Sequence, residues 1–187
     1  MDATTLRTAI GLRSTWFTVG VISLAAPVPS TPLRFGLPLP LLGTVRGVPG
    51  VTLEQRVSGG TWQAVGPVPS GVLKLTQRPT ITTDYRLATP NAAAAFVRIR
   101  VAPAIQLTTA STTEMAGSEQ PPLPAAPVQV QSENADGSWT TVASGAVNAD
   151  GTFAVPVALS SGGTYRVSVG PATGYSAGTT PPQIVVR

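Results

Sequence analysis

The sequence predicts an all-β protein built from two consecutive antiparallel β-sandwiches, and three observations support this. Short β-branched runs are separated by turn residues, and the 187 residues include 19 Gly and 19 Pro, which is typical of short strands joined by turns. Leucine and alanine show no long helical periodicity. Finally, one pattern of residues occurs twice at a separation of about 80 residues, too long for a solenoid repeat and suited to two small domains.

The repeated pattern consists of an apolar residue, a tryptophan nine positions later, a valine three positions after that, and a later Tyr-Arg-apolar triplet. The matching positions, first copy and then second, are Leu53 and Val130, Trp62 and Trp139, Val65 and Val142, and the triplets that start at Tyr85 and Tyr165. Strict strand alternation would place the inward partner of tryptophan two or four positions on. Because both copies break the alternation at the same place, the sequence predicts a β-bulge that the two copies share.

The first predicted domain covers residues 15–103 and follows a lead-in arm at 1–14. Its first strand comes from the uncharged stretch 14–33. The apolar run 16–26 within that stretch is too short to span a bilayer, and Pro27 would break a helix. We favour a β-strand here, with a signal-like segment as the alternative. Further strands are expected at 38–48, 51–57, 72–75, 83–87 and 96–101.

The second predicted domain covers residues 104–187. Strands are expected around Val128–Val130, after the Asp136-Gly137 turn, after the Asp150-Gly151 turn and at 165–169, and Met115–Gly117 corresponds to Leu42-Gly43 upstream. Six or seven short strands per domain, with a buried tryptophan in each, predict immunoglobulin-like sandwiches. The residues expected in the two cores are Trp62, Trp139, Tyr85, Tyr165 and Phe153.

The composition argues against a catalytic unit. The chain has no cysteine and no histidine, which excludes disulfides, thiolate metal sites and a Ser-His-Asp or Cys-His machine built from this chain alone. Its eight acidic residues form no paired motif. The stretch Asn148–Gly151 resembles part of a calcium loop, but turn chemistry explains Asp-Gly better. We therefore predict no enzyme activity and no catalytic, cofactor-binding or metal-binding residue.

The distribution of positive charge bears on which partners the chain could bind. The formal net charge is +4, and the arginines are scattered along the chain, whereas nucleic-acid-binding proteins usually cluster them with aromatic residues. Nucleic acid is therefore not an expected partner. Tyr175, in a Gly-containing loop, and Arg98 and Arg100 are the candidate contact residues. Arg46 and Arg56 could join the two arginines in a patch against acidic wall polymers, although the four lie on different strands.

Several segments resemble the tandem β-sandwich region that follows the catalytic domain in some actinobacterial subtilisin-like serine peptidases. They are Thr15–Phe17, Leu53–Arg56, Thr83–Leu87, Val97–Pro103 and Gly163–Val167, and the likeness covers most of the chain from about residue 15. The resemblance implies secretion and a C-terminal accessory region covalently linked to a catalytic domain. It transfers no catalytic residue.

Two functions follow as expectations. The first is a non-catalytic accessory module of a secreted protein that spaces or anchors a peptidase domain. The alternative is an adhesive or self-assembling extracellular subunit, with 15–26 as a strand donated to a neighbour, or a carbohydrate- or cell-wall-binding module. The expected partners are a linked catalytic domain, cell-wall polymer or like subunits. We expect an extracellular location with no transmembrane segment, although no signal peptide is evident in the chain.

Overall fold

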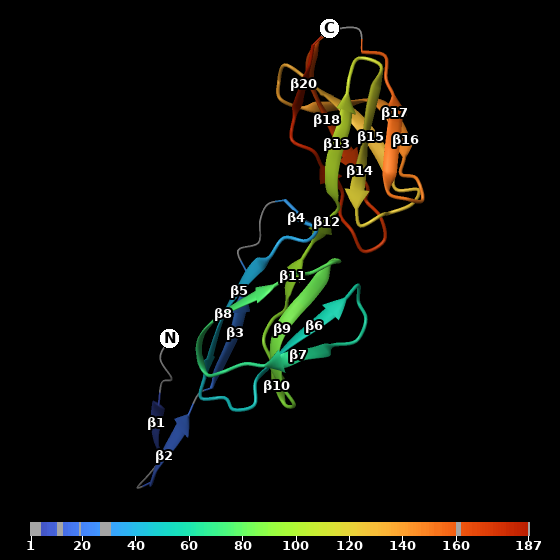
Figure 1. Ribbon diagram of the computed structural model, residues 1–187. Helices are drawn as coiled ribbons and strands as arrows, with labels where there is room; N and C mark the ends of the chain where they lie inside the picture. Colours follow the sequence, from blue (N-terminus) through green and yellow to red (C-terminus); the bar gives the residue numbers. More distant parts are fainter. Residues whose placement is uncertain (1–4, 11–12, 19, 27–30, 160–161, 187) are drawn as a thin grey trace. The chain divides into compact units, whose positions relative to one another are not determined.

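The computed structural model describes residues 5–10, 13–18, 20–26, 31–159 and 162–186. All regular secondary structure in these ranges is β-strand, which confirms the all-β prediction (Figure 1). The chain forms two compact units, and each has the two-sheet arrangement of an immunoglobulin-like sandwich. Unit 1 comprises Met1–Pro29, Pro38–Pro79 and Thr83–Ile99, and unit 2 comprises Ser30–Leu37, Thr80–Thr82 and Arg100–Arg187. The domain boundaries expected from the sequence remain a prediction.

The N-terminal part of the chain forms strands. β1 (Thr5–Ile10) and β2 (Arg13–Thr18) make an antiparallel hairpin. The remaining parts of the predicted lead-in arm, residues 1–4 and 11–12, lie outside the described residues. β3 (Val21–Ala25) pairs with β5 (Leu39–Arg46). The later part of the apolar run 16–26 therefore pairs within its own chain.

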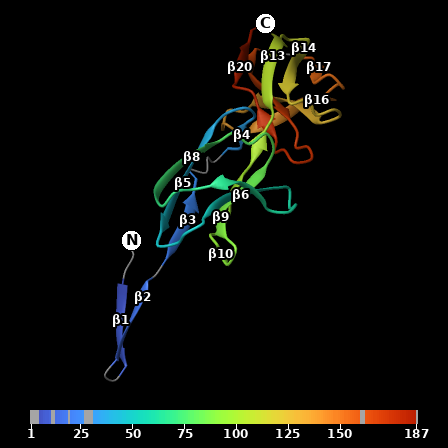
Figure 2. The same ribbon diagram turned by 60° about the horizontal axis from the view of Figure 1, so that its bottom comes forward.

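Besides the β1–β2 hairpin, the described part of unit 1 contains two antiparallel sheets (Figure 2). The smaller has the order β3-β5-β8, with β8 at Gly71–Gln77. The larger has the order β10-β9-β6-β7, and β11 also pairs with β9; its strands are β6 (Thr52–Val57), β7 (Gln63–Pro67), β9 (Thr83–Thr89), β10 (Ala92–Ala93) and β11 (Val97–Ile99). Alternating residues of both sheets, among them Leu41, Leu53, Leu73, Tyr85 and Leu87, are buried, as expected for two sheets with one apolar face each.

Unit 2 repeats this topology strand for strand. β13 (Ala104–Ala110), β14 (Glu114–Gln120) and β17 (Thr152–Pro156) form the smaller sheet. The larger has the order β16-β15-β18-β19, with β20 also on β18; these are β15 (Pro127–Glu133), β16 (Trp139–Ala146), β18 (Gly163–Val169), β19 (Gly178–Thr179) and β20 (Gln183–Val185). β4 (Leu33–Arg34) and β12 (Val101–Ala102) form a short parallel pair. The core includes Val128, Val130, Phe153, Val155 and Val167.

The predicted bulge is present in both units. In unit 1, Leu53 lies opposite Gly66 and Glu54 opposite Ala64, so Val65 is the extra residue of β7. In unit 2, Val130 lies opposite Ala143 and Gln131 opposite Thr141, so Val142 is the extra residue of β16. Both valines are exposed. The bulge thus explains the three-residue spacing, and it places each valine at the surface rather than in the core.

One glycine in each small sheet is required by close packing. Gly43 lies opposite Leu73 and Gly117 opposite Phe153, so the two hold equivalent places, as the sequence comparison predicted. A Cβ atom at Gly43 would come within 3.0 Å of the Ser23 carbonyl oxygen. A Cβ at Gly117 would come within 2.8 Å of the Phe153 ring and would also meet the backbone of the neighbouring strand.

Two Asp-Gly turns in unit 2 have the same construction. Oδ1 of Asp136 accepts hydrogen bonds from the backbone N–H and hydroxyl of Ser138, and Oδ1 of Asp150 accepts the same two bonds from Thr152. These bonds lower the pKa of both carboxyls. Among the described residues, no group of three or more His, Cys, Asp or Glu could hold a metal ion. Turn chemistry accounts for the Asn148–Gly151 segment.

Candidate binding surface on the larger sheet of unit 1

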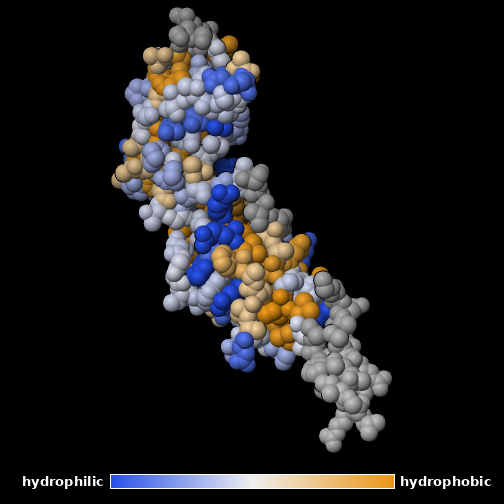
Figure 3. Space-filling model, turned by 180° about the vertical axis from the view of Figure 1, so that it is seen from behind, coloured by the Kyte–Doolittle hydropathy of each residue, from blue (hydrophilic) through white to orange (hydrophobic). Residues whose placement is uncertain are grey.

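Unit 1 has both apolar and charged surface. Leu42 on β5 and Val72 on β8 are exposed on the outer face of the smaller sheet, and Figure 3 shows apolar residues gathered on part of this unit beside a strip of hydrophilic ones. The larger sheet carries charged residues on its outer face. Nothing in the structure indicates what would cover the apolar residues, whereas the charged face has a defined side-chain arrangement.

Strand alternation determines this charged face. On β9, Tyr85 and Leu87 are buried in the core, which leaves Asp84 and Arg86 on the outer side. On β6, Leu53 is buried, so Glu54 and Arg56 also lie outside. The register places Glu54 opposite Arg86, Arg56 opposite Asp84, and Arg98 of β11 on the other side of Asp84. Each acidic residue therefore faces an arginine across the sheet, an arrangement that stabilises cross-strand pairs.

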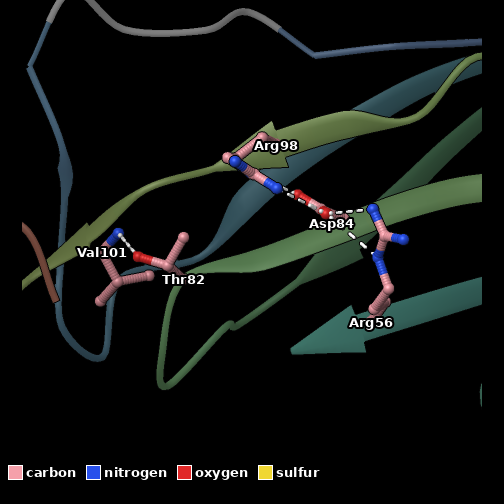
Figure 4. Close-up of polar contacts among 5 residues, drawn as sticks. All are labelled: Arg56, Thr82, Asp84, Arg98 and Val101. Atoms are coloured by element: carbon pink, nitrogen blue, oxygen red, sulfur yellow. Dashed lines mark hydrogen bonds and ion pairs between the residues drawn. The ribbon is translucent and has the colours of Figure 1, made fainter. Parts of the chain in front are cut away.

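The opposed residues form ion pairs, and those of Arg56 and Arg98 converge on Asp84 (Figure 4). Nη2 of Arg56 lies 2.8 Å from Oδ2 of Asp84, and Nε of Arg98 lies 2.7 Å from Oδ1. Arg98 makes a second bond to Oδ2 at 3.0 Å, so its pairing is bidentate. Nε of Arg86 lies 2.7 Å from Oε2 of Glu54. Only 3% of the Asp84 side chain is exposed, against 55% of the Arg98 side chain.

The arginines hold the buried carboxylate in its charged form. The hydrogen bonds from Arg98 lower the pKa of Asp84 most, burial opposes this, and Arg56 lowers the pKa further. Conversely, Asp84 raises the pKa of Arg98. Asp84 therefore remains ionised at neutral pH and positions both guanidinium groups.

Two aromatic rings lie against the same guanidinium groups. The guanidinium carbons of Arg86 and Arg56 are 4.1 and 4.5 Å from the Trp62 ring centroid. Those of Arg56 and Arg98 are 5.3 and 5.8 Å from the centroid of Phe96, whose side chain is exposed. Such distances are typical of cation–π contacts. We call the set of residues Glu54, Arg56, Trp62, Asp84, Arg86, Phe96 and Arg98 the arginine–aromatic layer.

Unit 2 has only part of this arrangement. The guanidinium of Arg166 lies 4.1 Å from the Trp139 ring centroid, and its Nε donates to Oε1 of Gln131 at 2.8 Å. By register, Gln131 takes the place of Glu54, and Ile184 and Thr164 take those of Arg98 and Asp84. Two residues further along β15, on the same face, Glu133 takes the place of Arg56. The outer face of unit 2 thus retains one Trp–Arg pair.

The residues expected in the cores fall into two groups. Tyr85, Tyr165 and Phe153 are buried. Trp62 and Trp139 instead are half-buried on the outer faces, because each precedes its bulge on the side where the arginines lie. Sequence reasoning treated a tryptophan in a small sandwich as a core residue. One signal in the sequence could have placed them outside. Charged residues at 54, 56, 84 and 86 alternate with apolar or buried neighbours such as Tyr85 and Leu87, which marks an outer face rich in charge where a tryptophan could pack against arginines.

The residues expected to contact a partner do not lie on one surface. Arg98 belongs to the layer together with Arg56, whereas Arg46 lies on β5 in the other sheet. Arg100 is exposed and belongs to unit 2. The hydroxyl of Tyr175 donates to the Thr80 carbonyl oxygen at 2.8 Å, so this tyrosine fastens one loop of unit 2 to another. Sequence reasoning did not identify Glu54, Asp84, Arg86 or Phe96 as surface partners.

Comparisons with known proteins find low similarity in sequence and structure. No model of a known protein family matches the sequence, and no curated protein matches it. Among solved structures, one titled "Biofilm associated protein - BSP domain" matches with a TM-score of 0.35 and 13% identity over 86% of this chain, which spans 29% of that structure's length. The "D0-D1 domain of Intimin" matches with a TM-score of 0.32 and 12% identity over 90% of this chain and 100% of that one. Nothing here links the chain to subtilisin-like peptidases. No helix in the described part of the chain is long and apolar enough to cross a membrane.

Proposed function

We propose that this chain is a non-catalytic binding module of an extracellular protein and that the arginine–aromatic layer is its binding surface. One observation carries the proposal: unit 1 has a seven-residue charged and aromatic layer at a place where unit 2, with the same topology, has a single Trp–Arg pair. Unit 2 is an internal control for what the fold requires. The additional charges of unit 1 exceed that requirement.

A net gain in stability does not account for the layer, although removing one partner of an ion pair is costly. Partly exposed ion pairs contribute about 0–1 kcal/mol each, and burying a carboxylate such as Asp84 costs free energy that its partners largely offset. The layer instead holds guanidinium groups in fixed positions. A ligand that binds them does not have to order flexible side chains, and this lowers the entropic cost of binding.

The test compares the natural chain with a face-exchange variant that gives unit 1 the residues of unit 2: Glu54→Gln, Arg56→Glu, Asp84→Thr and Arg98→Ile. Trp62 and Arg86 remain, so the variant keeps the Trp–Arg pair that unit 2 already contains. Lys74→Gln, an exposed position on β8 of the other sheet, causes the same net charge change and is the control.

The natural chain and the Lys74 variant are expected to bind to purified cell-surface material from bacteria or host cells in a sedimentation assay, and the face-exchange variant is expected not to. Circular dichroism and a thermal melt establish that all three are folded. Equal retention of all three proteins would refute the layer as the binding surface.

A second candidate is the accessory role expected from the sequence, in which two rigid sandwiches space or anchor a linked catalytic domain. The repeated topology favours it. In a spacer, both outer faces are passive, so face exchange would leave the activity and surface retention of the linked domain unchanged. Self-assembly through strand donation has less support, because Val21–Ala25 already pairs with β5 within the chain.

A further inference from the structure

We infer that the layer binds the carboxylate or sulfate groups of an acidic polysaccharide. This inference rests on the proposed function and adds the ligand class. It starts from the charges of the layer: three arginines stand against two acidic residues, so the layer carries an excess of one positive charge. The opposed ion pairs neutralise most of the charge but use only some of the N–H donors of the arginines.

Several of those donors are still available. Arg86 bonds Glu54 through Nε alone among the described residues, which leaves both of its terminal nitrogens unused. Arg98 uses Nε and Nη2 on Asp84, and more than half of its side chain is exposed. A guanidinium group has five N–H donors in a planar fork that fits a carboxylate or sulfate group. Arg86 and Arg98 therefore offer two fixed donor sets on one sheet face.

The aromatic rings argue against a neutral sugar platform. Stacking of a neutral sugar requires an open ring face, but Trp62 has two guanidinium groups within 4.5 Å of its centroid. Phe96 is the exposed ring, and Arg56 and Arg98 lie near it. The rings serve to hold arginines in place, and the groups offered to a ligand are N–H donors.

A polysaccharide fits this surface better than nucleic acid. Nucleic acid has a phosphate at every residue and is usually bound by clustered positive charge without intervening acids. In the layer, Glu54 and Asp84 lie between the arginines and would repel closely spaced phosphates. An acidic polysaccharide has its charges further apart and separated by hydroxyl groups, which is compatible with acids between the donor sets.

The experiment measures retention of the full chain on four immobilised polymers: polygalacturonate, heparin, dextran and double-stranded DNA. It uses the natural chain, the face-exchange variant and the Lys74→Gln control, at low salt and at about 0.3 M NaCl, where exposed charges are largely screened. We expect the natural chain and the control to bind polygalacturonate or heparin, with dissociation constants about tenfold lower than for the face-exchange variant, which equals about 1.4 kcal/mol. A preference between the two polymers distinguishes carboxylate from sulfate.

Two results would overturn the inference alone. Layer-dependent binding to dextran that salt does not weaken would keep the binding surface and reject the acidic ligand. Binding to DNA as tight as to either acidic polysaccharide would make the layer a general polyanion site. By contrast, binding that face exchange leaves unchanged, or retention on none of the four polymers and on no cell-surface material, would reject the proposed function as well.

Discussion

The two sandwiches have the same strand order, the same bulge and the same Trp–Arg contact. They differ in the surroundings of a buried acidic residue. In unit 1, Asp84 lies on the outer face and receives two arginines. In unit 2, Glu119 is 3% exposed at the end of β14. Its Oε1 accepts the Leu123 N–H, and its Oε2 has no hydrogen-bond partner among the described residues. One unit uses its buried acid to position cations, and the other bears an unpaired carboxylate oxygen in its interior.

The comparison shows which features belong to the fold and which to one unit. Features present in both units, such as the bulge and the glycine in the small sheet, follow from packing two twisted sheets. Features present in one unit, such as the additional arginines, require another explanation.

The largest effect is expected from the shared glycines. Gly117→Ala should lower the free energy of unfolding of unit 2 by about 3 kcal/mol, because the new methyl group meets both backbone and the Phe153 ring. Gly43→Ala should lower that of unit 1 by about 1 kcal/mol, since the nearest atom, the Ser23 carbonyl oxygen, is 3.0 Å away. Urea unfolding followed by tryptophan fluorescence measures both. Equal effects would contradict the difference in packing.

Removal of the acid that positions the arginines should have the next largest effect. Asp84→Asn should cost unit 1 about 2 kcal/mol at pH 7, because two guanidinium groups lose a charged acceptor. Since the folded-state pKa of Asp84 is lowered, its contribution is complete above the unfolded-state pKa and is lost as pH falls through the folded-state pKa. The natural chain should therefore lose stability between about pH 5 and pH 2, and the variant should lose less over that range.

The buried acid of unit 2 should behave in the opposite way. Burial raises the pKa of Glu119, and its bond from Leu123 opposes this only in part. An acid with a raised folded-state pKa contributes most below its unfolded-state pKa, about 4.3, and that stability is lost as pH rises through the folded-state pKa. Glu119→Gln retains the acceptor for Leu123 and removes the buried charge.

Thermal melts from about pH 4 to pH 8 test this prediction. The glutamine variant should be about 1 kcal/mol more stable than the natural chain at pH 7 and should lose the advantage at pH 4. Destabilisation at pH 7 would mean that the ionised carboxylate has a compensating partner. It would also remove the contrast between Asp84 and Glu119.

The sequence predicted the repeated topology well, because strand alternation and turn residues are local signals. The shared Trp-to-Val spacing also predicted a bulge in both units, but its extra residues, Val65 and Val142, are exposed and are not inward partners of the tryptophans. It did not predict the sides on which Trp62 and Trp139 lie. A half-buried ring covered by guanidinium groups satisfies the same apolar pattern as a core ring, and only the cross-strand register distinguishes the two. The convergence of Arg56 and Arg98 on Asp84 likewise depends on pairing across 28 and 14 residues, which composition cannot show.

The smallest effect is expected at the contact that the two units share. Arg86→Lys and Arg166→Lys each retain the charge but lose the flat guanidinium group that lies 4.1 Å from the tryptophan centroid. Each should cost about 0.5 kcal/mol of unfolding free energy, and the two costs should be similar if the contact belongs to the fold. Ligand retention should respond differently: Arg86→Lys should weaken it, and Arg166→Lys should leave it unchanged. Equal loss of retention in both variants would place binding on the shared Trp–Arg contact, and the additional arginines of unit 1 would then need another explanation.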